Sequence, residues 1–191
     1  MGRDRGLIRA ALRHFALFFG IAVGIGGGWA GYLRLSGNFH VVEEGVLYRS
    51  AQLSFAQFEH NIRANGIKSV INLRGENVDA AWYKDELKAA AATNARHIDF
   101  RLSATHEVSD EKLEALAKLL REVVKPVLVH CEGGADRSGL ASALFELVIA
   151  NRPATMAGEQ LSFRYGHFPW LGSRTIAMDN SFDRLAAREN R

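Results

Sequence analysis

The sequence predicts an α/β fold in which helices flank a mostly parallel sheet of four to five strands. Short runs rich in β-forming residues alternate with longer amphipathic stretches over residues 46–151, and this alternation is typical of parallel sheets covered by helices. The run PVLVH at 126–130 is apolar enough for a strand that is buried on both faces. Because no internal repeat or low-complexity tract interrupts residues 39–191, we assign them to one domain.

The predicted strands and helices follow one another in regular order. Strands are expected at VLYRS (46–50), KSVINL (68–73), RHIDFRL (96–102) and PVLVH (126–130). Helices are expected at 54–66, 79–94, 109–124 and 138–151. Ser109 suits an N-cap, and Asp110 favours the first turn that follows it. Beyond Pro153 we expect further helices, and we expect the aromatic stretch FRYGHFPWL (163–171) to pack in the core.

Composition and charge narrow the class of protein. Of the 191 residues, 48% are hydrophobic and 24% are charged, as in globular domains. The net charge of +3 is unevenly spread, because residues 1–37 hold five arginines and one aspartate while the remainder holds 19 basic and 20 acidic residues. The nearly neutral body leaves no basic surface for DNA or RNA. The single cysteine cannot form an internal disulfide, so a role for it would be that of a nucleophile, ligand or redox group.

The N-terminal segment, residues 1–38, is rich in arginine at its start and apolar after it. Residues 15–33 carry no charge, follow four arginines and precede Arg34. A helix of this length reaches ~28 Å, close to the ~30 Å hydrocarbon core of a bilayer. We therefore predict a transmembrane helix at about 15–33 and a separate domain over 39–191.

The same segment predicts a topology. Because arginines favour the cytoplasmic side, we expect a single-pass protein with a cytoplasmic N-terminus and an extracytoplasmic domain. A cleaved secretory signal is the lesser alternative, since its apolar region is usually only about 7 to 15 residues long. Gly20, Gly24 and Gly28 lie on one helical face, which would allow a weak dimer through close helix packing.

The residues with chemical potential are concentrated in HCEGGADRSG, residues 130–139, directly after the last predicted strand. Sites in parallel sheets lie beyond the carboxyl ends of the strands. A strand that turns through glycines into a helix directs backbone N–H groups and the positive end of the helix dipole at one point, which suits an oxyanion such as phosphate. Arg137 adds a planar fork for two phosphate oxygens. The same positive field favours the nucleophilic thiolate of Cys131.

The spacing Cys-x5-Arg-Ser, with His130 ahead of it, resembles the cysteine-dependent protein tyrosine phosphatase superfamily, particularly its compact dual-specificity-like branch. LYRSAQ (47–52) and VINLRGE (70–76) also resemble that family, so the resemblance covers about residues 39–150. It implies that Cys131 attacks phosphorus to form a phosphocysteine, which water hydrolyses without a metal or other cofactor. It also implies stabilisation of the phosphoryl oxygens by Arg137 and by a substrate-binding loop. The members of that loop would be Glu132, Gly133, Gly134, Ala135 and Ser138.

Some residues near this loop allow two interpretations. The resemblance implies that Ser138 donates a hydrogen bond to the sulfur and that His130 orients the loop, but Ser138 could instead cap a helix and His130 could be an ordinary buried histidine. Arg49 and Arg74, at predicted strand ends, could form interior ion pairs or face substrate, and we favour a structural role. The aromatic pair Trp82 and Tyr83 could line the pocket or pack in the core.

The general acid has several candidates. Relatives commonly place an aspartate about 30 residues before the cysteine, where this chain has Asp99 within a predicted strand. The following loop offers His106 and Glu107, whereas Asp110 is explained by a helix first turn. A subset of related phosphatases has aspartate directly before the arginine, the position of Asp136 here. Because a carboxyl group beside bound phosphate must be protonated, which is the state that an acid requires, we favour Asp136.

The sequence thus predicts a membrane-tethered phosphatase that acts on phosphomonoesters, with phosphotyrosine, phosphoserine or phosphothreonine in proteins as the default substrate. A lipid or sugar phosphate is the main alternative, because the anchor would hold the site near a bilayer. Ala135 counts modestly against phosphoinositides, since a lysine there would assist polyphosphorylated headgroups, and the acidic Glu132 makes densely anionic substrates less attractive. The non-enzymatic alternative is a catalytically inactive phosphate-binding module.

Overall fold

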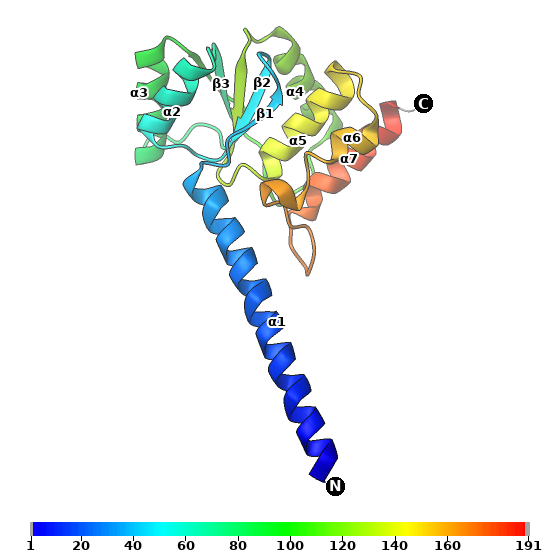
Figure 1. Cartoon of the computed structure of the whole chain (residues 1–191). Coiled ribbons are helices and arrows are strands. Elements are labelled where there is room, and N and C mark those ends of the chain that lie inside the picture. The colour runs from blue at the N-terminus through cyan, green and yellow to red at the C-terminus, as the bar shows by residue number, and fades with distance from the viewer. Residues whose placement is uncertain (1, 190–191) are drawn as a thin grey trace. The chain divides into compact units, whose positions relative to one another are not determined.

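The computed structural model describes residues 2–189 and divides the chain into two compact units, Met1–Leu35 and Ser36–Arg191. The first unit is a helix, α1 (Gly2–Leu35), and the second contains the sheet (Figure 1). Within α1, the 24 residues of Leu12–Leu35 have a mean hydropathy of 1.5 and are long enough to cross a membrane. A signal sequence meets the same criteria, so the transmembrane assignment stays a prediction.

The second unit is built on a five-stranded sheet in the order β1-β2-β5-β3-β4. The central strand β5 (Val127–His130) is parallel to both of its neighbours, β2 (Leu47–Ser50) and β3 (Ser69–Asn72). At one edge β4 (Arg96–Asp99) is parallel to β3, and at the other β1 (His40–Glu43) is antiparallel to β2. The predicted mostly parallel α/β fold is therefore confirmed. The sequence did not predict β1, because its four residues lack a strong apolar alternation.

Helices cover both faces of this sheet (Figure 1). On one face α2 (Phe55–Ala64) and α3 (Ala81–Thr93) bury Phe58 and Ala89 against Leu128 of β5. On the other face lie α4 (Asp110–Glu122), α5 (Asp136–Leu144) and α7 (Ile176–Glu189). Their apolar side chains share a core with Val127 and Val129. Alternate residues of β5 thus face opposite layers, which is why PVLVH is continuously apolar.

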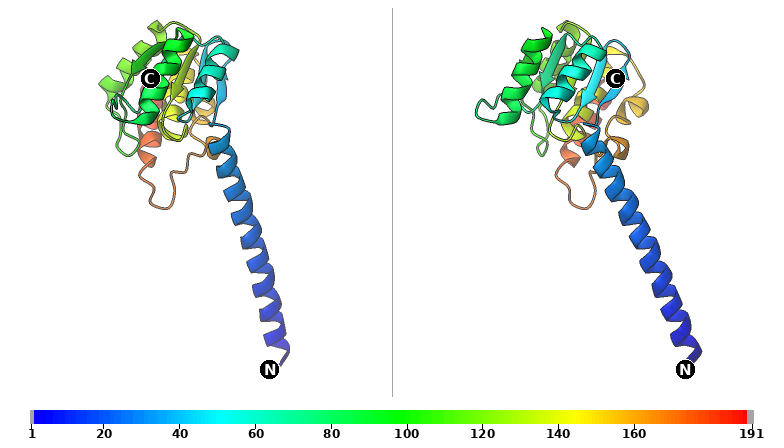
Figure 2. Two further views of the ribbon diagram at one scale, coloured as in Figure 1. Left: turned by 90° about the vertical axis from the view of Figure 1, so that its left-hand side faces the viewer. Right: turned by 60° about the vertical axis from the view of Figure 1, so that its left-hand side comes forward.

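The tail differs from its predicted packing. A π-helix, η1 (Phe145–Ile149), continues α5, and the short helices α6 (Ala154–Gly158) and η2 (Phe163–Tyr165) precede α7. We expected FRYGHFPWL to pack in the core, but only Tyr165 and His167 are buried. Phe163 is exposed within η2, and Phe168, Trp170 and Leu171 are exposed because the chain leaves η2 as a loop that projects from the unit (Figure 2).

Candidate active site

The loop of residues 131–135 joins the end of β5 to the start of α5, as the sequence predicted. Gly134 has φ +72°, in the left-handed region that favours glycine. A Cβ on this residue would lie 2.5 Å from the backbone nitrogen of Ala51, so the loop passes too close to β2 for any side chain here. Gly133 has no such constraint, since nothing lies within 4 Å of its Cβ position. We call residues 131–137 the phosphate loop.

Three side-chain and backbone groups hold the outside of the phosphate loop. The backbone N–H of Gln52 donates to the carbonyl of residue 132 at 3.0 Å. Asn38 Nδ2 donates to the carbonyl of residue 133 at 2.9 Å, and Arg49 Nη2 donates to the carbonyls of residues 134 and 135 at 2.7 and 3.0 Å. Four successive carbonyl groups are therefore bound by groups outside the loop.

This arrangement fixes the direction of four N–H groups. In a planar trans peptide the N–H of one residue points opposite to the carbonyl of the residue before it. Since the carbonyls of residues 132–135 are held on the outer side, the N–H groups of residues 133–136 face the inner side. None of these N–H groups donates a hydrogen bond to another residue in the described part of the chain. They form a concave set of donors of the kind that binds an anion.

Arg49 holds the outer side of this loop from within the protein core. Its side chain is fully buried, and besides the two loop carbonyls Nη1 binds the backbone and side-chain oxygens of Gln160 at 2.7 and 2.8 Å. The ring of Tyr165 lies 4.0 Å from its guanidinium carbon. Burial lowers the pKa of Arg49 to about 10, so the side chain remains a cation at neutral pH. The structural role that the sequence favoured for Arg49 is the one observed.

Cys131 and Arg137 provide the reactive and the charged group of the loop. Cys131 is buried at the end of β5. Arg137 is half-buried in the first turn of α5, and its buried Nε has no hydrogen-bond partner within residues 2–189. An Nε–H group without a partner, on a loop whose amides face inward, suits a bound oxyanion.

Ser138 differs in part from its expected role. Its side chain is buried at the start of α5, and its hydroxyl donates to the backbone carbonyl of Ser50 at 3.3 Å. The hydroxyl is thus committed to β2 in this structure, whereas the resemblance implied donation to the sulfur. The remaining loop positions divide by exposure: Glu132 and Gly133 are exposed, and Gly134 and Ala135 are buried.

A buried network behind the cysteine involves a residue that we did not single out from the sequence. Glu86 of α3 accepts hydrogen bonds from His130 Nε2 at 2.7 Å, from His97 Nε2 at 2.8 Å and from Gln52 Nε2 at 3.0 Å. Burial acts to raise the pKa of Glu86, but these partners outweigh it and hold the pKa at about 2. His130 is therefore fixed by an ionised carboxylate, which supports both its predicted orienting role and its burial. The sequence did contain a sign that Glu86 is buried, because Glu86 lies on the same helical face as Tyr83 and Ala90.

A second buried group connects the loop with the tail. His167 Nδ1 is 2.7 Å from Asp136 Oδ1, and His167 Nε2 is 2.8 Å from Asp179 Oδ2 of α7. Burial alone would lower the pKa of His167, but the two carboxylates outweigh it and raise the pKa above its usual value. His167 thus lies between two aspartates, one of which belongs to the phosphate loop.

The other acid candidates have different partners. Asp99, at the end of β4, accepts hydrogen bonds from Asn72 at 2.8 Å and from the hydroxyl of Tyr83 at 2.6 Å. His106 is exposed and contacts Ser103 at 3.0 Å. The two remaining carboxylates, Glu107 and Asp110, pair with Arg184 of α7 at 2.8 and 2.9 Å.

Arg74 and Trp82 lie beside the loop. The guanidinium carbon of Arg74 is 3.6 Å from the centre of the Trp82 ring, and Nη1 donates to Gln52 Oε1 at 3.0 Å. Burial lowers the pKa of Arg74, and the charges of Glu132 and Arg137 act on it as well. Arg74 is therefore electrostatically coupled to the phosphate loop, whereas the sequence favoured an interior structural role.

A parallel α/β sheet whose central strand ends in a cysteine and arginine loop defines a cysteine-dependent phosphatase. Residues 28–159 match the model of the tyrosine phosphatase family. This match covers more than half of the chain, which therefore belongs to that family. No curated protein sequence matches the chain.

Solved structures share the fold. TpbA from P. aeruginosa is 22% identical, with a TM-score of 0.60 over 82% of this chain and 92% of that one. The catalytic core of the PP-IP phosphatase SIW14 from S. cerevisiae is 20% identical, with a TM-score of 0.60 over 80% of this chain and 93% of that one. PTPMT1 is 16% identical, with a TM-score of 0.56 over 80% of this chain and 98% of that one.

Proposed function

We propose that the chain hydrolyses phosphomonoesters by transferring the phosphoryl group first to Cys131 and then to water. The observation that carries this proposal is that, within residues 2–189, the loop that begins with Cys131 leaves the N–H groups of residues 133–136 and the buried Nε of Arg137 without a hydrogen-bond acceptor. Donors fixed in this way can stabilise the charge on the three phosphoryl oxygens without reorganising during the reaction.

The reaction has two steps. The thiolate sulfur of Cys131 forms a bond to phosphorus while the bond from phosphorus to the ester oxygen breaks, and the leaving oxygen takes a proton from Asp136. Water then attacks the phosphocysteine and gives a proton to Asp136, the sulfur–phosphorus bond breaks, and inorganic phosphate leaves. Cys131 and Asp136 return to their starting states.

The contacts of Asp136 support it as the acid. It lies inside the phosphate loop, 2.7 Å from His167 Nδ1, and a bound phosphate would favour the proton of this pair on the carboxyl group. The two oxygens of Asp99, in contrast, are already occupied by Asn72 and Tyr83. Glu107 and Asp110 are held by an arginine of α7.

Phosphotyrosine, phosphoserine or phosphothreonine in proteins is the substrate class that we propose first. The ring of Trp82 beside Arg74 offers an aromatic wall next to the loop, and TpbA has been solved in complex with phosphotyrosine. A lipid or sugar phosphate is the second candidate, favoured by the candidate membrane span at Leu12–Leu35. The exposed carboxylate of Glu132 disfavours densely anionic substrates.

The full-length chain in detergent micelles tests this proposal with an aryl phosphate. We expect vanadate-sensitive hydrolysis that Cys131→Ser abolishes, and a phosphocysteine that can be trapped by rapid acid quenching. Asp136→Asn should slow hydrolysis roughly 10²–10⁴-fold for a poor leaving group and much less for nitrophenyl phosphate. Asp99→Asn is the matched control. Tight phosphopeptide binding without turnover by the unaltered chain would instead indicate a binding module.

A further inference from the structure

The loop between η2 and α7 exposes large apolar side chains. We call residues 166–175 the aromatic loop. Phe168, Trp170 and Leu171 are 42%, 55% and 94% exposed, and the rings of Phe168 and Trp170 meet edge to face with 5.0 Å between their centres. The chain reverses at the tip, where Leu171 and Gly172 have φ values of 55° and 77°. Both views of Figure 2 show this loop projecting from the body.

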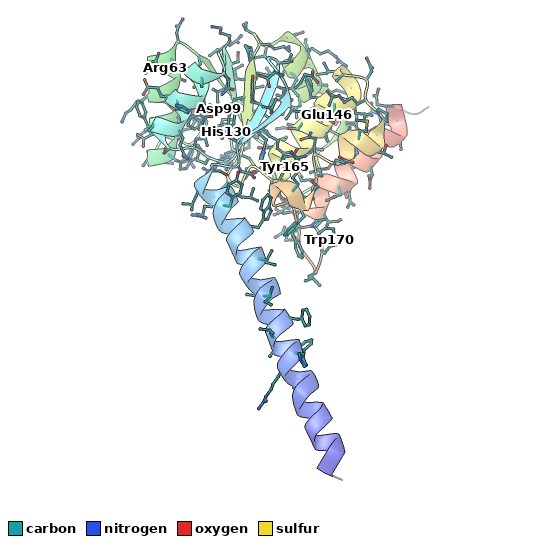
Figure 3. The ribbon with its side chains drawn as sticks, in the orientation of Figure 1. Arg63, Asp99, His130, Glu146, Tyr165 and Trp170 are labelled. Carbon is teal, nitrogen blue, oxygen red and sulfur yellow. The ribbon has the colours of Figure 1, made fainter. Side chains whose placement is uncertain are left out.

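The base of the aromatic loop is fixed at the active site. His167 is buried and lies 2.7 Å from Asp136 of the phosphate loop. Just before it, the carbonyl of Tyr165 accepts a hydrogen bond from Asn38 Nδ2 at 2.8 Å, and the same amide group donates to the carbonyl of Gly133. The apolar tip therefore projects from the end of the sheet at which β5 runs into the phosphate loop, with Trp170 beyond Tyr165 in Figure 3.

The composition and shape of this tip fit a lipid surface. Tryptophan is enriched at the boundary between bilayer and water, and tryptophan, phenylalanine and leucine form the apolar face of segments that lie in that boundary. Arg164 and Arg174 are exposed on either side of the tip, where they can pair with anionic headgroups.

Only a short segment of chain joins the candidate membrane span to the residue that contacts both loops. That span ends at Leu35, and Asn38 follows three residues later. Three extended residues reach at most ~11 Å. Asn38 binds both the phosphate loop and the base of the aromatic loop, so only three residues of chain separate the end of the candidate span from the residue that contacts both loops.

We propose that the aromatic loop inserts Trp170 and Leu171 into the headgroup region of a lipid bilayer, so that the phosphate loop works at the membrane surface. This contact would keep the carboxyl end of β5, where Cys131 lies, turned towards the lipid. A tether alone would allow the domain to rotate. The proposal concerns where the domain acts, and it is independent of which phosphomonoester is hydrolysed.

Depth-dependent quenching in vesicles tests the contact without any need for turnover. The full-length chain carrying Trp29→Phe and Trp82→Phe keeps Trp170 as its only tryptophan. In vesicles of phosphatidylcholine and phosphatidylglycerol brominated on the acyl chains, we expect its emission to fall roughly twofold or more. The control carries Trp29→Phe, Trp82→Phe, Trp170→Phe and Val124→Trp. Val124 is exposed and precedes the amino end of β5, whereas the phosphate loop follows its carboxyl end.

The control should show little quenching. Equal quenching of the two variants, or quenching of neither, would overturn the proposal. An unquenched Trp170 would indicate that the aromatic loop binds a protein partner instead. A second measurement compares substrates: Trp170→Ser with Leu171→Ser should retain activity on a soluble aryl phosphate and lose about tenfold on an aryl phosphate carried by a vesicle lipid. Undiminished hydrolysis of the lipid-borne substrate by this double variant would also contradict the proposal.

Discussion

Gly134 shows at the scale of one residue how tightly the phosphate loop is built. Its φ of +72° and the 2.5 Å approach to the backbone of Ala51 both exclude a side chain. Arg49 also binds its carbonyl at 2.7 Å, so the peptide cannot turn without losing a buried hydrogen bond. The neighbouring Gly133 is exposed and has open space at its Cβ position. Two adjacent glycines therefore have unequal structural importance.

We predict that Gly134→Ala lowers kcat/KM for an aryl phosphate by about 100-fold or more, because a displacement of ~1 Å in a catalytic group can cost that much. Gly133→Ala should lower kcat/KM much less, because nothing lies within 4 Å of the position that its added methyl group would take. Steady-state kinetics of both variants in micelles check this, with circular dichroism to confirm that both fold. Equal losses in the two variants would show that close approach to β2 does not shape the loop.

At the scale of elements, parts far apart in the sequence hold the phosphate loop. α3 supplies Glu86 behind His130, and the segment before β1 supplies Asn38. The tail supplies Gln160 against Arg49 and His167 against Asp136. Because every one of these contacts is long-range, the loop acquires its shape only when the whole domain has folded. The π-helix η1 contributes too, since Glu146 accepts from Gln160 at 2.8 Å.

The contact between the tail and the loop predicts a pH dependence of stability. The pKa of His167 is raised in the folded state above its ordinary value of 6.5. The folded protein therefore binds this proton more tightly than the unfolded chain does. The stabilisation is complete below pH 6.5 and is lost as the pH rises through the raised pKa. It amounts to about 1.4 kcal/mol for each unit by which the pKa is raised.

We predict that His167→Gln lowers the free energy of unfolding most below pH 6.5, and that its difference from the unaltered chain shrinks as the pH rises from there. Urea denaturation in micelles at several pH values, followed by circular dichroism, measures this difference. His60→Gln is the control, because His60 is an exposed histidine on α2. A deficit that stays constant or grows with pH would contradict a protonated His167 between two carboxylates.

The sequence predicted the alternating elements and the cysteine loop because both are local patterns. The apolar run of β5 and the spacing from Cys131 to Arg137 are visible within a dozen residues. Asn38, Glu86 and His167 were not predicted as parts of the site, since their importance depends on partners 31 to 95 residues away. The aromatic stretch was misassigned to the core for a similar reason: composition does not distinguish aromatics that pack inside from those at a projecting tip.

At the scale of the whole molecule, charge and hydropathy divide the chain in two. Five arginines and the apolar span lie within residues 1–37, while the nearly neutral body carries the catalytic loop. Within the body, the aromatic loop exposes three large apolar side chains close together in the sequence, Phe168, Trp170 and Leu171. If the span crosses a bilayer, the side on which the body lies decides which phosphomonoesters reach the phosphate loop. Topology is therefore the property of the whole chain that most limits its substrates.

We predict that the N-terminus is cytoplasmic and that the body lies across the membrane, because Arg3, Arg5, Arg9 and Arg13 precede the span and only Arg34 lies near its other end. In a bacterial host, a C-terminal alkaline phosphatase fusion should be active and a C-terminal green fluorescent protein fusion should be dark. Replacing the four leading arginines with glutamine and adding lysines after Leu35 should shift these reporters in the opposite direction, since the positive charges then lie beyond the span. Fluorescence of the unaltered fusion would place the body in the cytoplasm, and release of the body into the soluble fraction would identify a cleaved signal in place of an anchor.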